Sequence, residues 1–205
     1  NKARAANPAG TVVVDAGDMM QGTAVSNMLR GKPVIDVMNR IGYDAAALGN
    51  HEFDWTVDLL KERMAEARFP FLAANIYDKA TGERVSWAEP YTIMERRGLK
   101  VAIIGVTTPE TAFKTLPANV ADIEFKDPAL VVNDLAKELR ARGVNLVVLV
   151  GHIGGAVGKD GAITGPLADL ANAVTGVDAI VGGHSHTLMA GKVKGIPIIQ
   201  AYYNG

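Results

Sequence analysis

The sequence contains no cysteine among its 205 residues. This absence excludes disulfide bonds, thiolate zinc sites and cysteine nucleophiles, so any metal ion must be held by histidine, carboxylate, amide or backbone oxygen ligands. The chain also lacks an excess of charge, because 21 basic residues face 22 acidic ones and the formal net charge is −1. Such a chain has no global basic field, and we expect no nucleic-acid polymer among its partners.

Long hydrophobic runs are absent as well. No apolar stretch approaches the roughly 18 residues of a membrane span, and a content of 48% hydrophobic and 21% charged residues is typical of a globular protein. A length of 205 residues indicates one domain, or two small ones at most. The chain begins with Asn1, shows no signal peptide and stops directly after an apolar run. We therefore interpret it as a fragment of a longer protein.

Short apolar runs alternate with helix-like stretches along the chain. This alternation predicts an α/β domain with a largely parallel, buried sheet. Residues 107–126 show little periodicity, and we expect a long surface loop there. We expect strands at residues 11–16, 45–48, 69–74, 91–94, 101–106, 146–150 and 179–181, with a hairpin between the fourth and fifth of these and another at 192–199. Helices are expected at residues 24–42 in two pieces, 55–67, 128–142 and 166–174.

The four histidines of the chain all follow predicted strands within a few residues, with glycine nearby. Two of them form a His-Ser-His sequence, in which alternate side chains of an extended segment point the same way. Ligands of open α/β sheets bind at the carboxyl ends of the strands, where parallel strands place their following loops together. The side chains that we expect to converge there are Asp18, Asn50, His51, His152, His184 and His186.

Simpler interpretations exist for single members of this set. A single histidine at a strand end is usually only a polar cap. The placement of all four histidines of the chain at strand ends is poorly explained by capping alone. Asp54 either caps the helix that follows it or accepts a hydrogen bond from His51 and orients the imidazole, and one carboxylate can do both. We expect Glu52 to point away from the site, whereas Asn75 ends a strand from which its side chain can reach it.

Several motifs resemble those of the calcineurin-like metallophosphoesterases in their order and context. They are Gly17-Asp18, Gly49-Asn50-His51-Glu52, Gly151-His152 and Gly183-His184-Ser185-His186. The longer strings GDMMQG, PVIDVMNRIGYDAAALGNHEFDW, LAANI and GVTTPET are similar to the bacterial branch that includes 5′-nucleotidases, UDP-sugar hydrolases and 2′,3′-cyclic-nucleotide phosphodiesterases. The resemblance covers nearly the whole chain and implies a four-layer α/β/β/α sandwich, with residues 1–205 as the catalytic domain.

The same resemblance implies two divalent metal ions as cofactors, with Mn, Zn, Fe and Co all suited to mixed nitrogen and oxygen ligands. In that family pattern Asp18 bridges the two ions. Asn50, His152 and His184 bind one of them, and His186 binds the other. The family's first motif, Asp-x-His, occurs nowhere in this sequence. We attribute its absence to truncation; the alternative is true loss, which would leave a single-metal or inactive protein.

His51 and Asp54 match the catalytic dyad of the family. The implied function is metal-dependent hydrolysis of phosphate esters, most favourably nucleotides, by in-line attack of a hydroxide that bridges the metals. The implied setting is periplasmic or extracellular, with a C-terminal domain that binds the nucleobase in the full-length protein. The alternatives are a sulfur-ester hydrolase on the same site and a non-catalytic metal-binding domain. The presence of both dyad residues argues against the second alternative, because neither is needed to hold metal.

Overall fold

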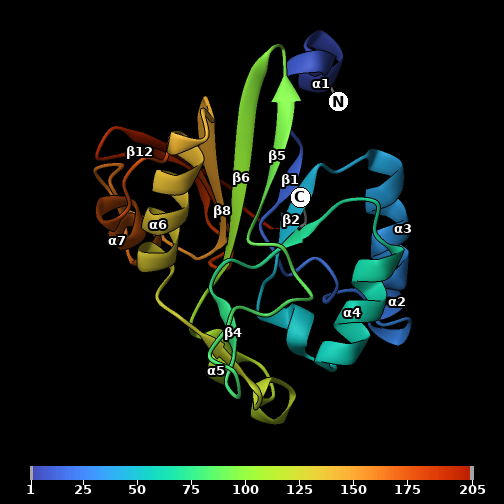
Figure 1. The fold of residues 1–205 in the computed structure, drawn as a ribbon. Helices are drawn as coiled ribbons and strands as arrows, with labels where there is room; N and C mark the ends of the chain where they lie inside the picture. The colour runs from blue at the N-terminus through green and yellow to red at the C-terminus, as the bar shows by residue number, and fades with distance from the viewer. Residues whose placement is uncertain (1, 204–205) are drawn as a thin grey trace.

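Two β-sheets packed face to face form the centre of the molecule, as seen in a computed structural model that describes residues 2–203 (Figure 1). The first sheet is parallel throughout and has the order β1 (Val14–Asp15), β2 (Ala45–Ala47) and β3 (Phe71–Leu72). The second sheet has the order β12 (Leu188–Val193), β13 (Ile196–Ala201), β11 (Ala179–Gly182), β8 (Leu146–His152), β6 (Leu99–Thr107) and β5 (Tyr91–Arg96). Its four inner strands are parallel, and the two edge strands are antiparallel to their neighbours.

Helices cover the outer face of each sheet (Figure 1). The first sheet is covered by α2 (Ala24–Met28), α3 (Lys32–Ile41) and α4 (Val57–Glu66), and the second by α6 (Pro128–Ala141) and α7 (Pro166–Ala173). Helices α3, α4, α6 and α7 bury apolar residues in the core beneath them, as the 3.6-residue periodicity predicts, whereas α2 buries only Ser26. The predicted four-layer α/β/β/α architecture is therefore confirmed.

Small residues allow the two sheets to approach closely. Ala45 and Ala47 of β2 face the second sheet, whereas Ala46 between them faces the helices, as strand alternation requires. Gly105 of β6 lies against Leu72, and a Cβ atom at that glycine would stand 2.2 Å from the Leu72 Cβ. The sandwich therefore leaves no room for a larger side chain at Gly105.

The two predicted hairpins are confirmed as β5–β6 and β12–β13. Their turns consist of Arg97-Gly98 and Lys194-Gly195, and all four residues have positive φ, from 51° to 82°. A two-residue turn with this backbone matches the right-handed twist of the paired strands. The other predicted strands and helices lie within a few residues of the observed ones.

The expectation of a long surface loop at residues 107–126 is wrong. Strand β6 runs to Thr107, and the segment then forms α5 (Thr111–Lys114), a 3-10 turn η3 (Pro117–Val120) and β7 (Ile123–Phe125). Strand β7 pairs with β4 (Ile76–Asp78), and Val120 and Ile123 are buried in the core under the first sheet. Long-range packing orders this segment, which local periodicity does not reveal.

The remaining short elements are α1 (Lys2–Ala6), η1 (Pro8–Gly10), η2 (His51–Phe53), β9 (Ala156–Val157) and β10 (Ile163–Thr164). Among residues 2–203, no helix has both the length and the apolar character to cross a lipid bilayer.

Candidate metal centre

Strands β1, β2, β8 and β11 direct their carboxyl ends to one cleft. His152 is the last residue of β8, and the other polar side chains stand on the turns that follow the remaining strands. The cleft has a volume of about 790 Å³. The candidate residues that line it are Asp18, His51, His152, His184 and His186.

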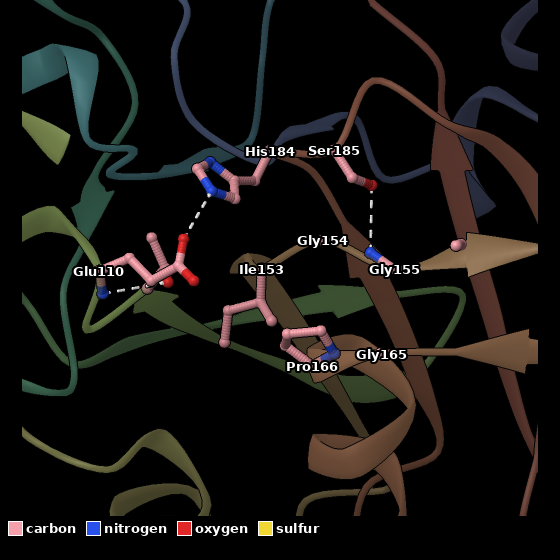
Figure 2. Close-up of a pocket in the computed structure, with 10 residues that line it drawn as sticks. Glu110, Ile153, Gly154, Gly155, Gly165, Pro166, His184 and Ser185 are labelled. Carbon is pink, nitrogen blue, oxygen red and sulfur yellow. Dashed lines mark hydrogen bonds and ion pairs between the residues drawn. The ribbon is translucent and has the colours of Figure 1, made fainter.

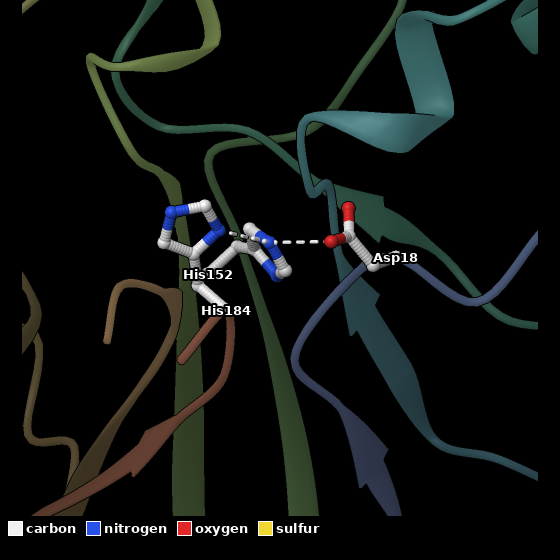
Figure 3. Close-up of side chains that lie close together, drawn as sticks. All are labelled: Asp18, His152 and His184. Atoms are coloured by element: carbon white, nitrogen blue, oxygen red, sulfur yellow. Dashed lines mark hydrogen bonds and ion pairs between the residues drawn. The ribbon is translucent and has the colours of Figure 1, made fainter. Parts of the chain in front are cut away.

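Three side chains meet most closely at the base of the cleft (Figure 3). The Nε2 atom of His152 lies 2.9 Å from Asp18 Oδ2 and 3.1 Å from His184 Nδ1. One ligand atom from each residue falls within 4.8 Å of the other two. Two imidazole nitrogens and a carboxylate oxygen at this spacing are suited to one first-row divalent cation.

The turns that carry these side chains have unusual backbone. Asp18, His184 and His186 all have positive φ, at 66°, 71° and 51°. Non-glycine residues adopt this left-handed region rarely, and it is maintained when the surrounding structure requires it. The sharp turn reverses the chain immediately after each strand and brings the side chains of Asp18 and His184 together over the strand ends.

Glu52 holds the first two turns together, contrary to the expectation that it points away. Its carboxylate is buried and accepts hydrogen bonds from the backbone N–H groups of Gly49 (2.6 Å), Asp18 (2.7 Å) and Met20 (3.2 Å). Asp18 Oδ1 in turn accepts a hydrogen bond from the N–H of His51 at 2.8 Å. These bonds fix the position of Asp18, a role for which the sequence carries no signal beyond the place of Glu52 beside His51.

Asn50 supplies an observation that favours a cation. Its side chain is 3% exposed, and its Oδ1 atom has no hydrogen-bond partner among the described residues. A buried amide oxygen without a partner is costly, because it has given up its hydrogen bonds to water. The neighbouring turn residues contact Asp18, so the unpartnered oxygen belongs to the loop beside the histidine cluster and fits the role of a further ligand.

The charges of the cluster shift the pKa values of its members. Burial would raise the pKa of Asp18, but the hydrogen bond and charge of His152 outweigh it and the pKa is lowered. Burial would likewise lower the pKa of His152, yet the Asp18 carboxylate raises it. Burial and the neighbouring His152 lower the pKa of His184. Burial and the Asp18 charge raise the pKa of Glu52 to about 7. A proton and a cation therefore compete for the same nitrogen of His152.

His51 and Asp54 form a contacting pair at the rim of the cleft. The Nδ1 atom of His51 lies 2.6 Å from Asp54 Oδ2, and Asp54 Oδ1 accepts a hydrogen bond from Thr115 at 3.0 Å. Asn119 donates to the backbone oxygen of Asp54. Helix α4 is capped instead by Thr56, whose hydroxyl accepts from the N–H of the third helical residue. The geometry thus favours orientation of the imidazole over helix capping for Asp54.

Two candidates stand apart from this arrangement. His186 lines the cleft but lies outside the three-residue cluster, and its ring centroid is 5.6 Å from that of Tyr203. Asn75 does not reach the site, because its amide bonds to the backbone of Thr107 and Lys126 and joins β6 to the segment after β7. Thr115 and Asn119 contact the dyad residue Asp54 but lie in the segment that the sequence suggested was a loop.

A sandwich of two sheets with a histidine and aspartate cluster at the strand ends defines a metallophosphoesterase of the calcineurin-like class. The family model described as "Bacterial capsule synthesis protein PGA_cap" matches residues 8–199. The chain belongs to this family and lies on the 5′-nucleotidase branch of the metallophosphoesterases.

Individual relatives support that placement. The chain is 35% identical to Endonuclease YhcR of Bacillus subtilis over all of its own length and 18% of that protein. It is 38% identical to a 5′-nucleotidase of Vibrio cholerae over 85% of its own length and 32% of that protein. The solved structure of the calcineurin-like phosphoesterase YfkN of Bacillus subtilis matches with a TM-score of 0.83 and 28% identity, covering 97% of this chain and 69% of that one. The chain thus spans about a third or less of these curated relatives.

Proposed function

We propose that this chain is the catalytic domain of a metal-dependent phosphoesterase that hydrolyses nucleotides. The observation that supports it most is the meeting of Asp18, His152 and His184 within 4.8 Å of one another, in the same cleft as His51. The 5′-nucleotidase names of relatives favour nucleotides as the substrate class. The family resemblance also favours a periplasmic or extracellular setting and a further domain that binds the nucleobase.

Asp18, Asn50, His152 and His184 would hold one divalent cation. The second cation of the family pattern would have only Asp18 and His186 as ligands from this chain. Its other ligands belong to the family's Asp-x-His motif, which is absent from the sequence. When bound, divalent cations supply Lewis-acid polarisation of the phosphate and lower the pKa of a water molecule. We therefore expect one nearly complete metal site in this chain and low turnover by it alone.

His51 acts on the reacting phosphate rather than on the metal. Its Nδ1 atom is engaged by Asp54, so the neutral imidazole carries a proton on Nδ1 and the cationic one adds a proton on Nε2. The His51 side chain is 39% exposed at the cleft, where a substrate can reach it. It stabilises charge on the transferring phosphoryl group or protonates the leaving oxygen, while Asp54 holds the ring in place.

The test begins with calorimetry of Mn or Zn binding to the chain and to its His152→Ala variant. We expect about one ion per chain and a large loss of affinity in the variant, since the imidazole at the base of the cluster is removed. Equal binding by the two proteins would refute the assigned centre. Vigorous, metal-dependent hydrolysis of p-nitrophenyl phosphate by this chain would contradict the view that only one site is nearly complete.

A substrate panel separates the related possibilities. It compares a nucleoside monophosphate, a UDP-sugar, a 2′,3′-cyclic nucleotide, a sulfate ester and a short oligonucleotide, which is included because one relative is named an endonuclease. In protein that holds both cations, we expect the nucleoside monophosphate to be hydrolysed fastest. A preference for the sulfate ester would replace the proposed function with the sulfur-ester alternative.

A further inference from the structure

A second pocket lies on the other side of His184 and contains a carboxylate that the centre described above does not use (Figure 2). Its volume is about 210 Å³, and its lining includes Glu110, Ile153, Gly154, Pro166 and His184. Glu110 stands immediately before α5, on the turn after β6, whereas His184 follows β11. The Glu110 Oε2 atom lies 3.3 Å from His184 Nε2, and Figure 2 shows the two side chains pointing toward each other.

The two nitrogens of His184 therefore face different partners. Nδ1 faces the cluster, where it lies 3.1 Å from His152 Nε2, and Nε2 faces Glu110. In a neutral imidazole only one nitrogen carries the proton, and the hydrogen bond made by one nitrogen decides which of them offers a lone pair. A carboxylate accepts but does not donate, so Glu110 selects the tautomer of His184 with its proton on Nε2 and its lone pair on Nδ1.

His152 follows the same scheme with its nitrogens exchanged. Its Nδ1 atom lies 2.8 Å from the carbonyl oxygen of Ala16, an acceptor, so that Nε2 offers its lone pair to the cluster. Both imidazoles thus have an acceptor on the outer nitrogen and a free lone pair on the inner one. Histidines that ligate metals usually show this outer contact, which fixes the ring and raises the basicity of the ligating nitrogen.

Backbone contacts hold Glu110 in place on its turn. Its N–H donates to the Thr108 hydroxyl, and its carbonyl oxygen accepts from the N–H groups of Phe113 and Lys114. The side chain is 43% exposed, and as an isolated surface ion pair its contact with His184 would contribute little to stability. Its effect is therefore expected on the ring orientation and metal affinity of His184 rather than on folding.

We propose that Glu110 is a positioning residue of the metal centre, which directs the Nδ1 lone pair of His184 toward the cation by accepting a hydrogen bond from the N–H group at Nε2. This inference rests on the proposed function, because it takes His184 as a metal ligand. On this proposal Glu110 acts through His184 and would contact neither the cation nor the substrate.

The experiment measures Mn affinity by calorimetry for the unmodified chain and for its Glu110→Ala, Glu110→Gln, Glu124→Ala and His184→Ala variants. Glu124 is an exposed carboxylate on β7 and serves as the matched control for loss of one negative charge. We expect Glu110→Ala to weaken Mn binding by about 10–100-fold, the usual effect of removing such an outer partner. Glu110→Gln keeps an acceptor oxygen and should lose less than about tenfold, and Glu124→Ala should bind as the unmodified chain does.

Nitrogen-15 NMR of the metal-free protein supplies a second measurement, taken at about pH 8, where histidine side chains are ordinarily neutral. We expect His184 to carry its proton on Nε2 in the unmodified chain and in Glu110→Gln, and to show a mixture of tautomers in Glu110→Ala. Unchanged Mn affinity together with an unchanged tautomer in Glu110→Ala would overturn the inference while leaving the metal centre intact. Unchanged Mn binding in His184→Ala would instead remove the proposed centre, and the role of Glu110 with it.

Discussion

At the scale of single residues, three of the four imidazoles that line the cleft have one nitrogen in contact with a protein acceptor, which leaves the other nitrogen for the cation or the substrate. His51 contacts Asp54, His152 contacts the Ala16 carbonyl, and His184 contacts Glu110. Such partners fix the tautomer and the ring orientation before any ligand arrives. The chemistry of the site is therefore decided by contacts of the outer nitrogens, which come from three different loops.

The dyad is predicted to act on turnover and not on metal binding. In protein that holds both cations, His51→Ala should lower kcat by about 10²–10⁴, the usual contribution of one acid, base or charge-stabilising side chain. Asp54→Asn should act in the same direction but less strongly, because the amide still contacts the ring. Steady-state kinetics and metal analysis of the same preparations check both statements. An emptied metal site in His51→Ala would assign this histidine a different role.

Metal affinity is predicted to fall as the pH is lowered. The pKa of His152 is raised by Asp18, so in the metal-free protein its Nε2 atom keeps a proton to a higher pH than an ordinary histidine does. The cation must displace this proton, and affinity should drop by about tenfold per pH unit below the raised pKa. Calorimetry from about pH 8 to 5.5 measures this slope. The His51→Ala variant is the control and should show the same profile, whereas a flat profile in the unmodified chain would speak against His152 as a ligand.

At the scale of elements, the site depends on how closely the turn after β1 approaches the turn after β2. A Cβ atom at Gly49 would lie 2.2 Å from Asp18 Oδ1 and 2.5 Å from the Asp18 backbone nitrogen. Glycine is required there because two loop backbones meet with no space for a side chain. Glu52 supports the same approach by accepting hydrogen bonds from both turns.

Gly49→Ala is therefore predicted to displace Asp18. We expect a loss of stability of about 1–3 kcal/mol, as for other overpacked positions, together with a loss of Mn affinity of at least about tenfold. Urea unfolding and calorimetry measure the two effects. Gly191→Ala on β12 is the matched control, because the nearest atom there, at 3.0 Å, is the flexible end of Ile163. Equal stability and equal Mn affinity in the two variants would mean that the close approach of the two turns is not required for the metal site.

At the scale of the whole molecule, a half-buried acid that lines the cleft links folding to pH. Burial raises the pKa of Asp15 in β1 to about 6, although the N–H of Gly17 bonds to its carboxylate. The unfolded chain releases this proton near pH 3.8, whereas the folded chain keeps it up to about pH 6. The contribution of Asp15 to stability is therefore full below about pH 4 and is lost as the pH rises to about 6.

Asp15→Asn removes this titration while keeping an acceptor oxygen for Gly17. Relative to the unmodified chain, the variant should gain stability as the pH rises from about 4 to 6, by up to about 3 kcal/mol, and the difference should then stay constant. Urea unfolding of both proteins at several pH values measures this difference. A difference that does not change with pH would show that Asp15 titrates normally in the folded protein.

The sequence patterns alone determined the α/β class of the fold and the edge of the sheet at which the polar residues gather, whereas the four layers followed from the family resemblance. Apolar periodicity located the helices and strands, because burial of one face imposes a repeat of 3.6 or 2 residues. The convergence of Asp18 and the histidines followed from the rule that parallel strands place their carboxyl ends together. The positions of the elements and the convergence of their ends depend on local residue patterns and on general rules of strand topology. Both can be applied to a single sequence.

Only the tertiary structure decided which side chains meet within that edge. Glu52 turned inward, Asn75 bonded elsewhere, Thr115 reached Asp54 and Glu110 reached His184. These residues stand on loops and short turns, where no periodicity reports burial or direction. Their contacts depend on the left-handed backbone at single positions and on the packing of segments that lie far apart in the sequence. The physical reason is that a loop side chain takes its direction from the path of the backbone, and that path is set by distant neighbours.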